Sequence, residues 1–497
     1  MKISINPLTQ ESCTIPVVLD DEQNLQDFLA RNKGKKVIVV QGLGFVGAVM
    51  ALVCANSITE EYAVIGIDLA RKDTYWKIKA INDGVFPLVA DDPKIAEFFK
   101  RSQEKGNFFA TYDTAAFKYA DIVIVDINLD VQKRSDEGGS LEGFDVDLSG
   151  FKVAIKSIGA NCREDVLVLV ETTVPPGTCE QIVKPVIEDQ LSLRGLSLEN
   201  YRLGHSYERV MPGPDYIDSI REFPRVYSGA NLVSGDAIEA FLHTIIDTSV
   251  CELTRLEHTN ATEMAKVLEN SYRAMNIAFA VEWSRYAEEA GVNLYGMVDA
   301  IRVRKTHANL MYPGIGVGGY CLTKDPLLAS WSRRTFFGAK SDLNMSINSV
   351  STNDEMPVFA FGRLVQVFGD LADKKITFLG VSYRGDVGDT RYTPVHTLVD
   401  LVQKAGAKIK LHDPFVSYWE EKECVVEADL NKVLEPYPDL VVISTGHSAY
   451  KKESTIAELM KIAPAQIFDT IGLFDSEQIL TLQTRHQVSV LGRGDLD

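Results

Sequence analysis

Residues 36–47 decide the fold, and they read Lys36-Val37-Ile38-Val39-Val40-Gln41-Gly42-Leu43-Gly44-Phe45-Val46-Gly47. The first six form a short β-branched run, which predicts a buried strand. Glycines follow at once in the pattern GxGxxG, and an apolar helix is predicted from about Val46 to Ser57. A strand that passes through glycines directly into a helix is typical of βαβ units with a parallel sheet.

Each glycine has its own task in such a turn. Gly42 permits the tight bend, Gly44 lets the backbone approach a pyrophosphate, and Gly47 lets helix and strand pack closely. Asp68 ends the next predicted strand, Tyr62–Asp68, and its carboxylate can accept hydrogen bonds from the ribose hydroxyls of NAD. We therefore predict NAD binding. A tight turn without a ligand and an S-adenosylmethionine site are the alternatives.

Composition bounds the class of protein. The chain has 497 residues, 45% of them hydrophobic, and a net charge of −18. At about 150 residues per domain this length allows two to four domains. The acidic balance argues against wholesale nucleic-acid binding, and no apolar run reaches the ~20 residues of a membrane span. We expect a cytoplasmic protein that binds neither nucleic acid nor membrane.

The cysteines and histidines argue against a structural metal. Seven cysteines are widely spaced without a CxxC pair, which makes a disulfide framework or a zinc site improbable. None of the eight histidines has the spacing of a metal ligand. We expect reduced thiols and no metal.

Further patterns divide the chain into sections. Runs at 122–127 and 166–170 continue the strand and helix alternation, and Thr259–Ala290 contains no proline or glycine, which predicts one long helix. A second α/β section begins at Lys375. We predict an α/β fold with two Rossmann-like, doubly wound domains joined by a central helical domain. The expected boundaries are an extension at 1–35, an NAD-binding domain at 36–231, a helical domain at 232–345 and a C-terminal domain at 346–497.

The most unusual segment is Pro313–Pro326, which holds four glycines in the six residues 314–319 and then Cys321. Glycines allow a ligand to approach the backbone and present the thiol without crowding. A thiolate of lowered pKa is a strong nucleophile. A buried thiol in a flexible loop is the alternative. The glycines and the following pair Lys324-Asp325 favour the chemical role.

Polar residues also share one face of the predicted long helix. Lys266 and Asn270 are four residues apart, with Glu263 one turn earlier. A lysine beside an amide can hold a developing oxyanion and position a water. A solvated helix face is the alternative for this pair taken alone.

Three further clusters follow predicted strands. Thr173 lies in Glu171–Thr178, at a strand end where ligands bind in open α/β sheets. Glu208 stands beside Arg209 and is a candidate general base, with an ordinary surface ion pair as the alternative. The segment Tyr383–Arg391 offers cations that can grip phosphates.

Together and in this order, these motifs resemble the UDP-glucose/GDP-mannose dehydrogenase family. The resemblance runs from about Lys36 to Asp495 and also includes Thr172–Thr178 and Gly492-Arg493-Gly494-Asp495. It implies an NAD domain, a central dimerisation domain and a nucleotide-sugar domain. The implied activity is the four-electron oxidation of a sugar C6 alcohol to a carboxylate with two NAD. The implied partners are a nucleotide sugar, with a UDP-sugar favoured, and further copies of the chain in a homodimer or higher homo-oligomer.

The resemblance also assigns roles to residues. Cys321 would capture the aldehyde as a thiohemiacetal that becomes a thioester, Lys266 and Asn270 would hold the alkoxide-like oxygen, and water placed by Asp325, Thr173 or Glu208 would release the acid. The implied cofactor-binding residues are Gly42, Gly44, Phe45, Val46, Gly47, Asp68, Thr173, Lys324 and Arg391. The implied substrate-binding residues are Glu208, Arg209, Lys266, Asn270, Gly318, Gly319, Tyr383 and Arg384.

The chain departs from the family pattern in places. Asp126–Leu129 replaces the usual Val-Pro-Thr-Pro, His307 stands where an arginine is expected, and Thr470–Gly472 lacks an arginine. The segment Glu208–Gly213 looks more like the N-acetylhexosamine branch than the glucose branch, and we expect a route into surface polysaccharide. The alternatives are a single-step hydroxyacid dehydrogenase of the 6-phosphogluconate type, which needs no nucleophilic cysteine, and a non-catalytic nucleotide-sugar-binding subunit.

Overall fold

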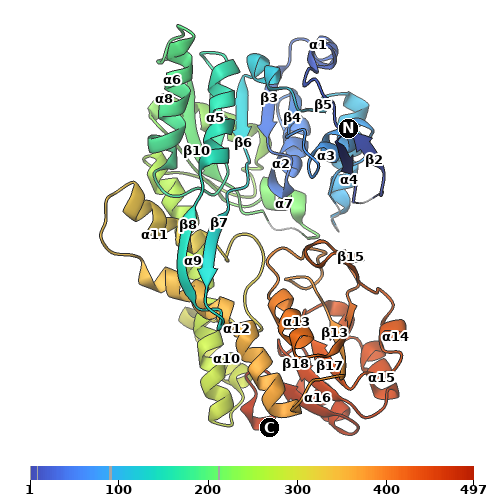
Figure 1. Cartoon of the computed structure of the whole chain (residues 1–497). Helices are drawn as coiled ribbons and strands as arrows, with labels where there is room; N and C mark the ends of the chain where they lie inside the picture. Colours follow the sequence, from blue (N-terminus) through green and yellow to red (C-terminus); the bar gives the residue numbers. More distant parts are fainter. Residues whose placement is uncertain (1, 8, 89–91, 211–212, 497) are drawn as a thin grey trace. The chain divides into compact units, whose positions relative to one another are not determined.

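The computed structural model describes residues 2–7, 9–88, 92–210 and 213–496. The chain forms two compact units. The first holds residues 1–130, 146–267 and 335–338, and the second holds 131–145, 268–334 and 339–497. Each unit is built on one main sheet, and Figure 1 shows the elements coloured along the chain.

An eight-stranded sheet forms the centre of the first unit, in the order β12-β11-β10-β9-β6-β3-β4-β5. Its strands are β3 (Lys36–Gln41), β4 (Tyr62–Ile67), β5 (Phe108–Thr111), β6 (Ile122–Val125), β9 (Leu167–Val170), β10 (Arg202–Tyr207), β11 (Arg225–Gly229) and β12 (Leu253–Arg255). Neighbouring strands are parallel except β10 and β11. The strand order reverses between β3 and β6, which is where a doubly wound sheet binds its ligand.

Helices bury this sheet because the strands are apolar on both faces. Ile38 and Val40 of β3 join one core, together with residues of five helices. These helices are α2 (Phe45–Ala55), α3 (Tyr75–Asn82), α4 (Pro93–Lys105), α7 (Tyr216–Arg221) and α8 (Leu232–Ile245). The helices α5 (Ser149–Asn161) and α6 (Lys184–Leu193) pack side by side (Figure 1). The α2 helix is buried from Gly47 to Ala55, as its apolar sequence predicts.

The first 31 residues contain more structure than the single helical patch that we expect near Leu25–Ala30. They form an antiparallel hairpin, β1 (Ile3–Ile5) with β2 (Ser12–Thr14), and the helix α1 (Glu22–Arg31). The hairpin packs against α3 (Tyr75–Asn82). Its strands are only three residues long, too short for a periodic signal.

The long helix α9 (Thr259–Glu289) starts in the first unit and continues into the second. The second unit adds α10 (Leu294–Arg302), α11 (Asp325–Thr335) and α12 (Asn344–Phe368). A hairpin, β7 (Val131–Ser135) with β8 (Leu141–Val146), reaches α12 from the first half of the sequence. Lys133 pairs with Asp354 at 2.6 Å and Ser140 donates to Glu355 at 2.8 Å. No motif in the sequence predicted this insertion.

A parallel five-stranded sheet completes the second unit, in the order β14-β13-β17-β18-β19. Its strands are β13 (Lys375–Leu379), β14 (Lys408–His412), β17 (Leu440–Ile443), β18 (Gln466–Asp469) and β19 (Gln487–Val490). One core joins Leu440 and Val442 to α12 and α13 (Pro394–Lys404). The opposite core joins Val441 and Ile443 to α14 (Leu430–Val433), α15 (Glu453–Lys461) and α16 (Ser476–Gln483). A two-stranded sheet, β15 (Tyr418–Trp419) with β16 (Cys424–Val425), lies outside it.

The predicted elements are confirmed with small shifts at their ends. The strand at 36–41 has the predicted bounds, and the long helix ends at Glu289, one residue earlier than expected. The strand expected at 122–127 stops at Val125, because its two partner strands β3 and β9 end opposite this residue, at Gln41 and Val170. The two-sheet α/β class holds.

Candidate active site

The glycine turn joins β3 to α2 with the geometry that a dinucleotide requires. Gly42 has φ +103°, which favours glycine, and a side chain there would meet the Asp126 carbonyl oxygen at 2.1 Å. A Cβ on Gly47 would lie 1.9 Å from the Gly42 carbonyl oxygen. A Cβ on Gly44 would meet Asn128 Oδ1 at 4.0 Å, an ordinary contact, and Gly44 precedes α2 without a side-chain cap. The start of α2, at Phe45 and Val46, is the end of a helix at which backbone N–H groups bind phosphates in other proteins.

Asp68 follows β4, and the turn holds its carboxylate in place. Asp68 accepts hydrogen bonds from the backbone N–H of Leu43 at 3.2 Å and of Leu69 at 2.7 Å, and Lys77 Nζ lies 4.0 Å away. Burial raises the pKa of this carboxyl. The turn, the helix start and this acid together fit NAD, because the Asp68 carboxylate would accept hydrogen bonds from the ribose hydroxyls.

Lys266 and Glu208 meet in the first unit, although 58 residues separate them. Lys266 Nζ donates to the Glu208 carbonyl oxygen at 2.8 Å and lies 3.8 Å from the Glu208 carboxylate. Both side chains are buried, and Lys266 also lies over the Tyr207 ring. Arg209 instead donates to the Pro224 carbonyl oxygen at 2.8 Å. Glu208 is therefore a buried partner of Lys266; Met211 and Pro212 of the same motif lie outside the described residues.

Two further buried acids, Glu171 and Asp126, interact electrostatically with Glu208, and the sequence analysis did not assign them to the site. Glu171 accepts a hydrogen bond from Arg225 at 2.9 Å, and both are almost fully buried. Burial raises the pKa of Glu171 to about 7 and that of Asp126 well above its usual range. The negative charge of Glu208 also raises both pKa values. Asp126 lies in the segment that departs from the family pattern, and this departure is the only feature of the sequence that could have pointed to these acids.

Glu263 fastens the start of α9 to the turn at 175–179. Its carboxylate accepts from the backbone N–H of Gly177 at 2.6 Å and of Cys179 at 2.8 Å. Nearby, the Thr172 hydroxyl donates to the Val125 carbonyl oxygen at 3.0 Å and accepts from the Ile127 N–H at 2.8 Å. Thr173 is thereby fixed at the carboxyl end of β9, as expected from its position after a strand.

In the second unit, Cys321 is exposed and lies one helical turn before α11. Its carbonyl oxygen accepts from the Asp325 N–H at 2.9 Å. Asp325 is fully buried and accepts from Asn270 Nδ2 at 2.6 Å and from Lys324 Nζ at 2.7 Å. The structure therefore brings Asn270, Lys324 and Asp325 into one network next to the cysteine loop, a set of contacts that the sequence did not predict. Exposure also excludes the alternative of a buried thiol.

The same loop packs against the segment that follows β13. The Gly319 N–H donates to the Arg391 carbonyl oxygen at 3.0 Å. A Cβ on Gly318 would lie 2.5 Å from Tyr383 Cβ, so the Tyr383 side chain needs glycine there. Arg391 pairs with Asp389 at 2.6 Å, and Arg384 is exposed.

A second network under this segment was not predicted. His447 Nδ1 accepts from the Asp386 N–H at 2.9 Å, so its other nitrogen carries the proton and donates to Asp413 at 3.0 Å. The Ser382 hydroxyl lies 3.1 Å from the same nitrogen. All three side chains are buried, and they come from the ends of three strands. The network fixes the start of the predicted phosphate-gripping segment.

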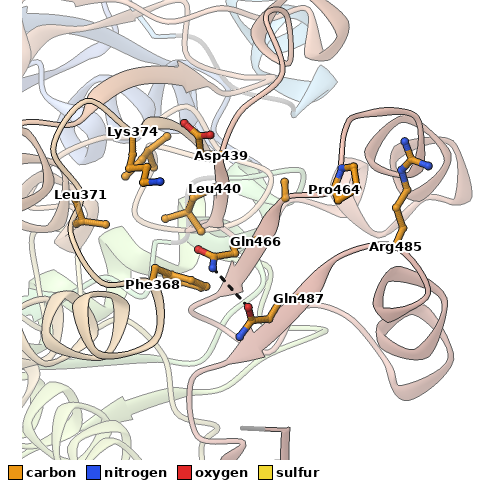
Figure 2. A pocket seen from close by; sticks show the side chains of 11 residues that line it. Phe368, Leu371, Lys374, Asp439, Leu440, Pro464, Gln466, Arg485 and Gln487 are labelled. Carbon is orange, nitrogen blue, oxygen red and sulfur yellow. Dashed lines mark hydrogen bonds between the residues drawn. The ribbon is translucent and has the colours of Figure 1, made fainter.

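Cavities in the second unit do not coincide with these residues. One of about 370 Å³ lies at the amino ends of β13, β17, β18 and β19, with Gln466 and Gln487 3.5 Å apart on its wall (Figure 2). Ligands of parallel sheets bind at the opposite, carboxyl ends. Another, of about 470 Å³, is lined by α9, α12 and residues 306–310, including His307. We assign the substrate to neither.

Within the described residues, no three His, Cys, Asp or Glu side chains form a group that could hold a metal ion. None of the described helices is long and apolar enough to cross a membrane.

Comparison with known proteins places this geometry in a family. The chain matches three domains of the UDP-glucose/GDP-mannose dehydrogenase family: the NAD binding domain at residues 36–244, the central domain at 260–353 and the UDP binding domain at 377–476. It is 30% identical over 423 residues to a UDP-N-acetyl-D-mannosamine dehydrogenase of Pyrococcus horikoshii, covering 83% of this chain and 90% of that one. A relative of the same name from Methanococcus maripaludis is 27% identical, with 93% and 97% covered.

Solved structures agree with these matches. A UDP-D-ManNAc dehydrogenase from Pyrococcus horikoshii has a TM-score of 0.76 at 27% identity, with 92% of this chain and all of that chain covered. An NDP-N-acetyl-D-galactosaminuronic acid dehydrogenase from Methanosarcina mazei has a TM-score of 0.73 at 26% identity, with 95% and 98% covered. The glycine turn, the Lys266 helix and the Cys321 loop all fall inside the matched domains. The chain belongs to the UDP-glucose/GDP-mannose dehydrogenase family of NAD-dependent nucleotide-sugar dehydrogenases.

Proposed function

We propose that the chain oxidises the C6 alcohol of a UDP-N-acetylhexosamine to a carboxylate, with Cys321 as the nucleophile that links two successive oxidations. The observation that carries this proposal is an exposed thiol in a glycine loop beside the buried Asn270–Asp325–Lys324 network. A simple alcohol dehydrogenase has no use for such a thiol. NAD, when bound, accepts one hydride in each oxidation.

The chain's own groups handle the protons of the first oxidation. The C6 hydroxyl loses its proton to Glu208 or to a water that Glu208 orients, while the hydride leaves carbon. Lys266 stabilises negative charge on that oxygen, since an ammonium ion held in a buried environment interacts strongly with a developing anion. Asn270 donates its amide N–H to the same oxygen. The product of this step is an aldehyde.

Cys321 retains the aldehyde. Its thiolate adds to the carbonyl carbon and forms a carbon–sulfur bond, and the oxygen takes a proton, which gives a thiohemiacetal. Loss of a second hydride from carbon and of the hydroxyl proton gives a thioester. Water then attacks the thioester, the carbon–sulfur bond breaks, and the acid and the Cys321 thiol are released. Asp325, Thr173 or Glu208 orients that water.

The remaining site residues bind the two ligands. We assign Gly42, Gly44, Phe45, Val46, Gly47, Asp68, Thr173, Lys324 and Arg391 to the cofactor. We assign Glu208, Arg209, Lys266, Asn270, Gly318, Gly319, Tyr383 and Arg384 to the nucleotide sugar. The N-acetylhexosamine substrate is supported by the relatives, which are UDP-N-acetyl-D-mannosamine dehydrogenases, and by the segment Glu208-Arg209-Val210. A product of this class suits polysaccharide synthesis.

We also propose the organisation of the chain. The motifs indicate an extension at 1–35, an NAD-binding domain at 36–231, a helical domain at 232–345 and a nucleotide-sugar domain at 346–497. We expect a cytoplasmic homodimer or higher homo-oligomer. The exposed aromatic residues of the second half of α9 support self-association: Phe279, Trp283 and Tyr286.

The decisive experiment measures NADH formed per sugar consumed over a panel of UDP- and GDP-sugars, for the wild type and Cys321→Ser. We expect two NADH per sugar for the wild type and loss of net acid formation in the variant. Cys424→Ser, a half-buried cysteine of the same unit, is the matched control and should behave as wild type. One NADH per sugar with an indifferent Cys321→Ser would leave a simple alcohol dehydrogenase.

A further inference from the structure

The N-terminal segment, residues 2–31, is built onto the cofactor half of the first unit. Its helix α1 buries Leu25 and Phe28, and the Phe28 ring lies 5.5 Å from that of Phe109 in β5. The match to the family's NAD binding domain begins only at residue 36. The segment is therefore an addition to the family domain that packs against it.

Ser4 connects this segment to the loop after Asp68. Its side chain is fully buried, and its hydroxyl donates to the Lys72 carbonyl oxygen at 2.7 Å. The Ser4 hydroxyl oxygen also accepts a hydrogen bond from the backbone N–H of Trp76, in the first turn of α3, at 3.1 Å. The Thr74 side chain makes no cap for α3, so Ser4 supplies a hydrogen bond that a helix start needs. Lys77, one residue later, is the cation nearest to Asp68 in that helix.

Asp21 acts on Asp68 through Thr111, which hydrogen-bonds to both residues. Its carboxylate accepts from the Thr111 hydroxyl at 2.6 Å, and its N–H donates to Asp113 at 3.0 Å. The Thr111 carbonyl oxygen in turn accepts the Asp68 N–H at 3.2 Å. The segment thus fixes both chain stretches that border the Asp68 carboxylate.

We propose that residues 2–7 and 9–31 are a clamp that positions the adenosine end of the NAD site, through Ser4 on the loop 69–76 and through Asp21 on Thr111. The proposal rests on the placement of the adenosine ribose at Asp68. A loop that is already ordered loses less conformational freedom when a ligand binds, which raises affinity without adding a contact. The clamp acts on cofactor binding, and Ser4 and Asp21 are positioning residues that touch no reacting atom.

The test compares Ser4→Ala with Ser12→Ala, an exposed serine of the same hairpin, in the full chain. Isothermal titration gives the Kd for NAD and for ADP-ribose, which contains the adenosine half without nicotinamide. For Ser4→Ala we expect both Kd values to rise by about threefold to tenfold, the effect of one lost hydrogen bond. Ser12→Ala should match the wild type, and kcat at saturating NAD should stay unchanged in both.

Thr111→Val serves as a second, isosteric variant, since Thr111 is fully buried and valine keeps the carbonyl oxygen that Asp68 uses. It should weaken NAD and ADP-ribose in the same way. Unchanged Kd values in folded Ser4→Ala and Thr111→Val, with only the free energy of unfolding lowered, would overturn the clamp. An equal loss in Ser12→Ala would do so too.

Asp68→Ala separates this proposal from the proposed function. If Asp68→Ala weakens ADP-ribose and the two clamp variants do not, the cofactor site stands and the clamp is wrong. If Asp68→Ala also binds ADP-ribose normally, the assigned adenosine site is wrong, and the clamp with it.

Discussion

Lys266 lies on the long helix α9, and its side chain contacts the backbone of Glu208, directly after β10. Its ammonium group is held by the Glu208 carbonyl oxygen at 2.8 Å, so its position is set before substrate arrives. Lys266→Met keeps the length of the side chain and removes the charge. We expect kcat to fall by about 10² to 10³, the usual effect of removing one donor to a developing oxyanion, with a small change in KM. Steady-state kinetics with the best sugar of the panel measures both.

The control for this variant lies on the same helix. Arg273→Met also removes one positive charge from α9, but Arg273 is exposed. It should keep kcat within about twofold of the wild type, as surface changes usually do. Equal losses in both variants would show that helix charge, rather than the placed ammonium group, matters.

The junction of β3 and α2 depends on Gly47. A methyl group there would meet the Gly42 carbonyl oxygen at 1.9 Å, and a backbone atom in a packed sheet cannot move far. Gly47→Ala should lower the free energy of unfolding by at least about 2 kcal/mol and abolish measurable NAD binding. Gly150→Ala in α5, where a Cβ meets nothing within 4 Å, should be neutral or slightly stabilising. Denaturant titration and calorimetry test the pair, and a stable Gly47→Ala that binds NAD would contradict this account.

The contact between α9 and the turn at 175–179 should make the stability of the protein depend on pH, because Glu263 forms it. Burial raises the pKa of Glu263 to about 7, from an ordinary value near 4.5. The folded state therefore holds this proton more tightly than the unfolded state does. Its contribution to stability is complete below the ordinary value and is lost as pH rises to about 7, a change of about 3 kcal/mol.

Glu263→Gln removes that titration. The free energy of unfolding of the variant, relative to the wild type, should rise between pH 5 and pH 8. Urea titrations of both proteins at the two pH values measure the difference. A difference that stays constant, or one that falls, would show that Glu263 is already ionised in the folded protein.

Self-association should depend on the exposed face of α9. Tyr272 and Phe279 are each more than half exposed, far more than expected of aromatic side chains on a protein that stays alone in solution. The double variant Tyr272→Asp/Phe279→Asp should sediment as the 55.0 kDa chain, while the wild type sediments at twice that mass. Leu480→Asp, at a residue that is more exposed but lies on α16, is the control and should keep the larger mass. A monomeric wild type would contradict the expected homodimer.

Local sequence patterns were sufficient to predict the helices and strands of the two main sheets and the chemical groups that follow them. The run at 36–41 and the glycines after it predicted β3, its turn and α2, because a strand and a helix start are encoded within a dozen residues. The same holds for the long helix and for the glycine loop that exposes Cys321. The insertion of β7 and β8 and the hairpin of β1 and β2 were missed, since strands this short carry little periodicity of their own.

The sequence by itself determined a doubly wound α/β fold, an NAD turn, the glycine loop around Cys321 and the family. Only the tertiary structure decided the partners of these groups: Lys266 with Glu208, Glu171 with Arg225, Asn270 with Asp325, and Ser4 with the loop after Asp68. The physical reason is the distance along the sequence between the interacting residues. Helices, strands and turns arise from neighbours a few residues apart, whereas these contacts join residues between 54 and 68 positions apart. Burial of each sheet under its helices brings such residues together, and burial also raises the pKa values of Glu171 and Asp126.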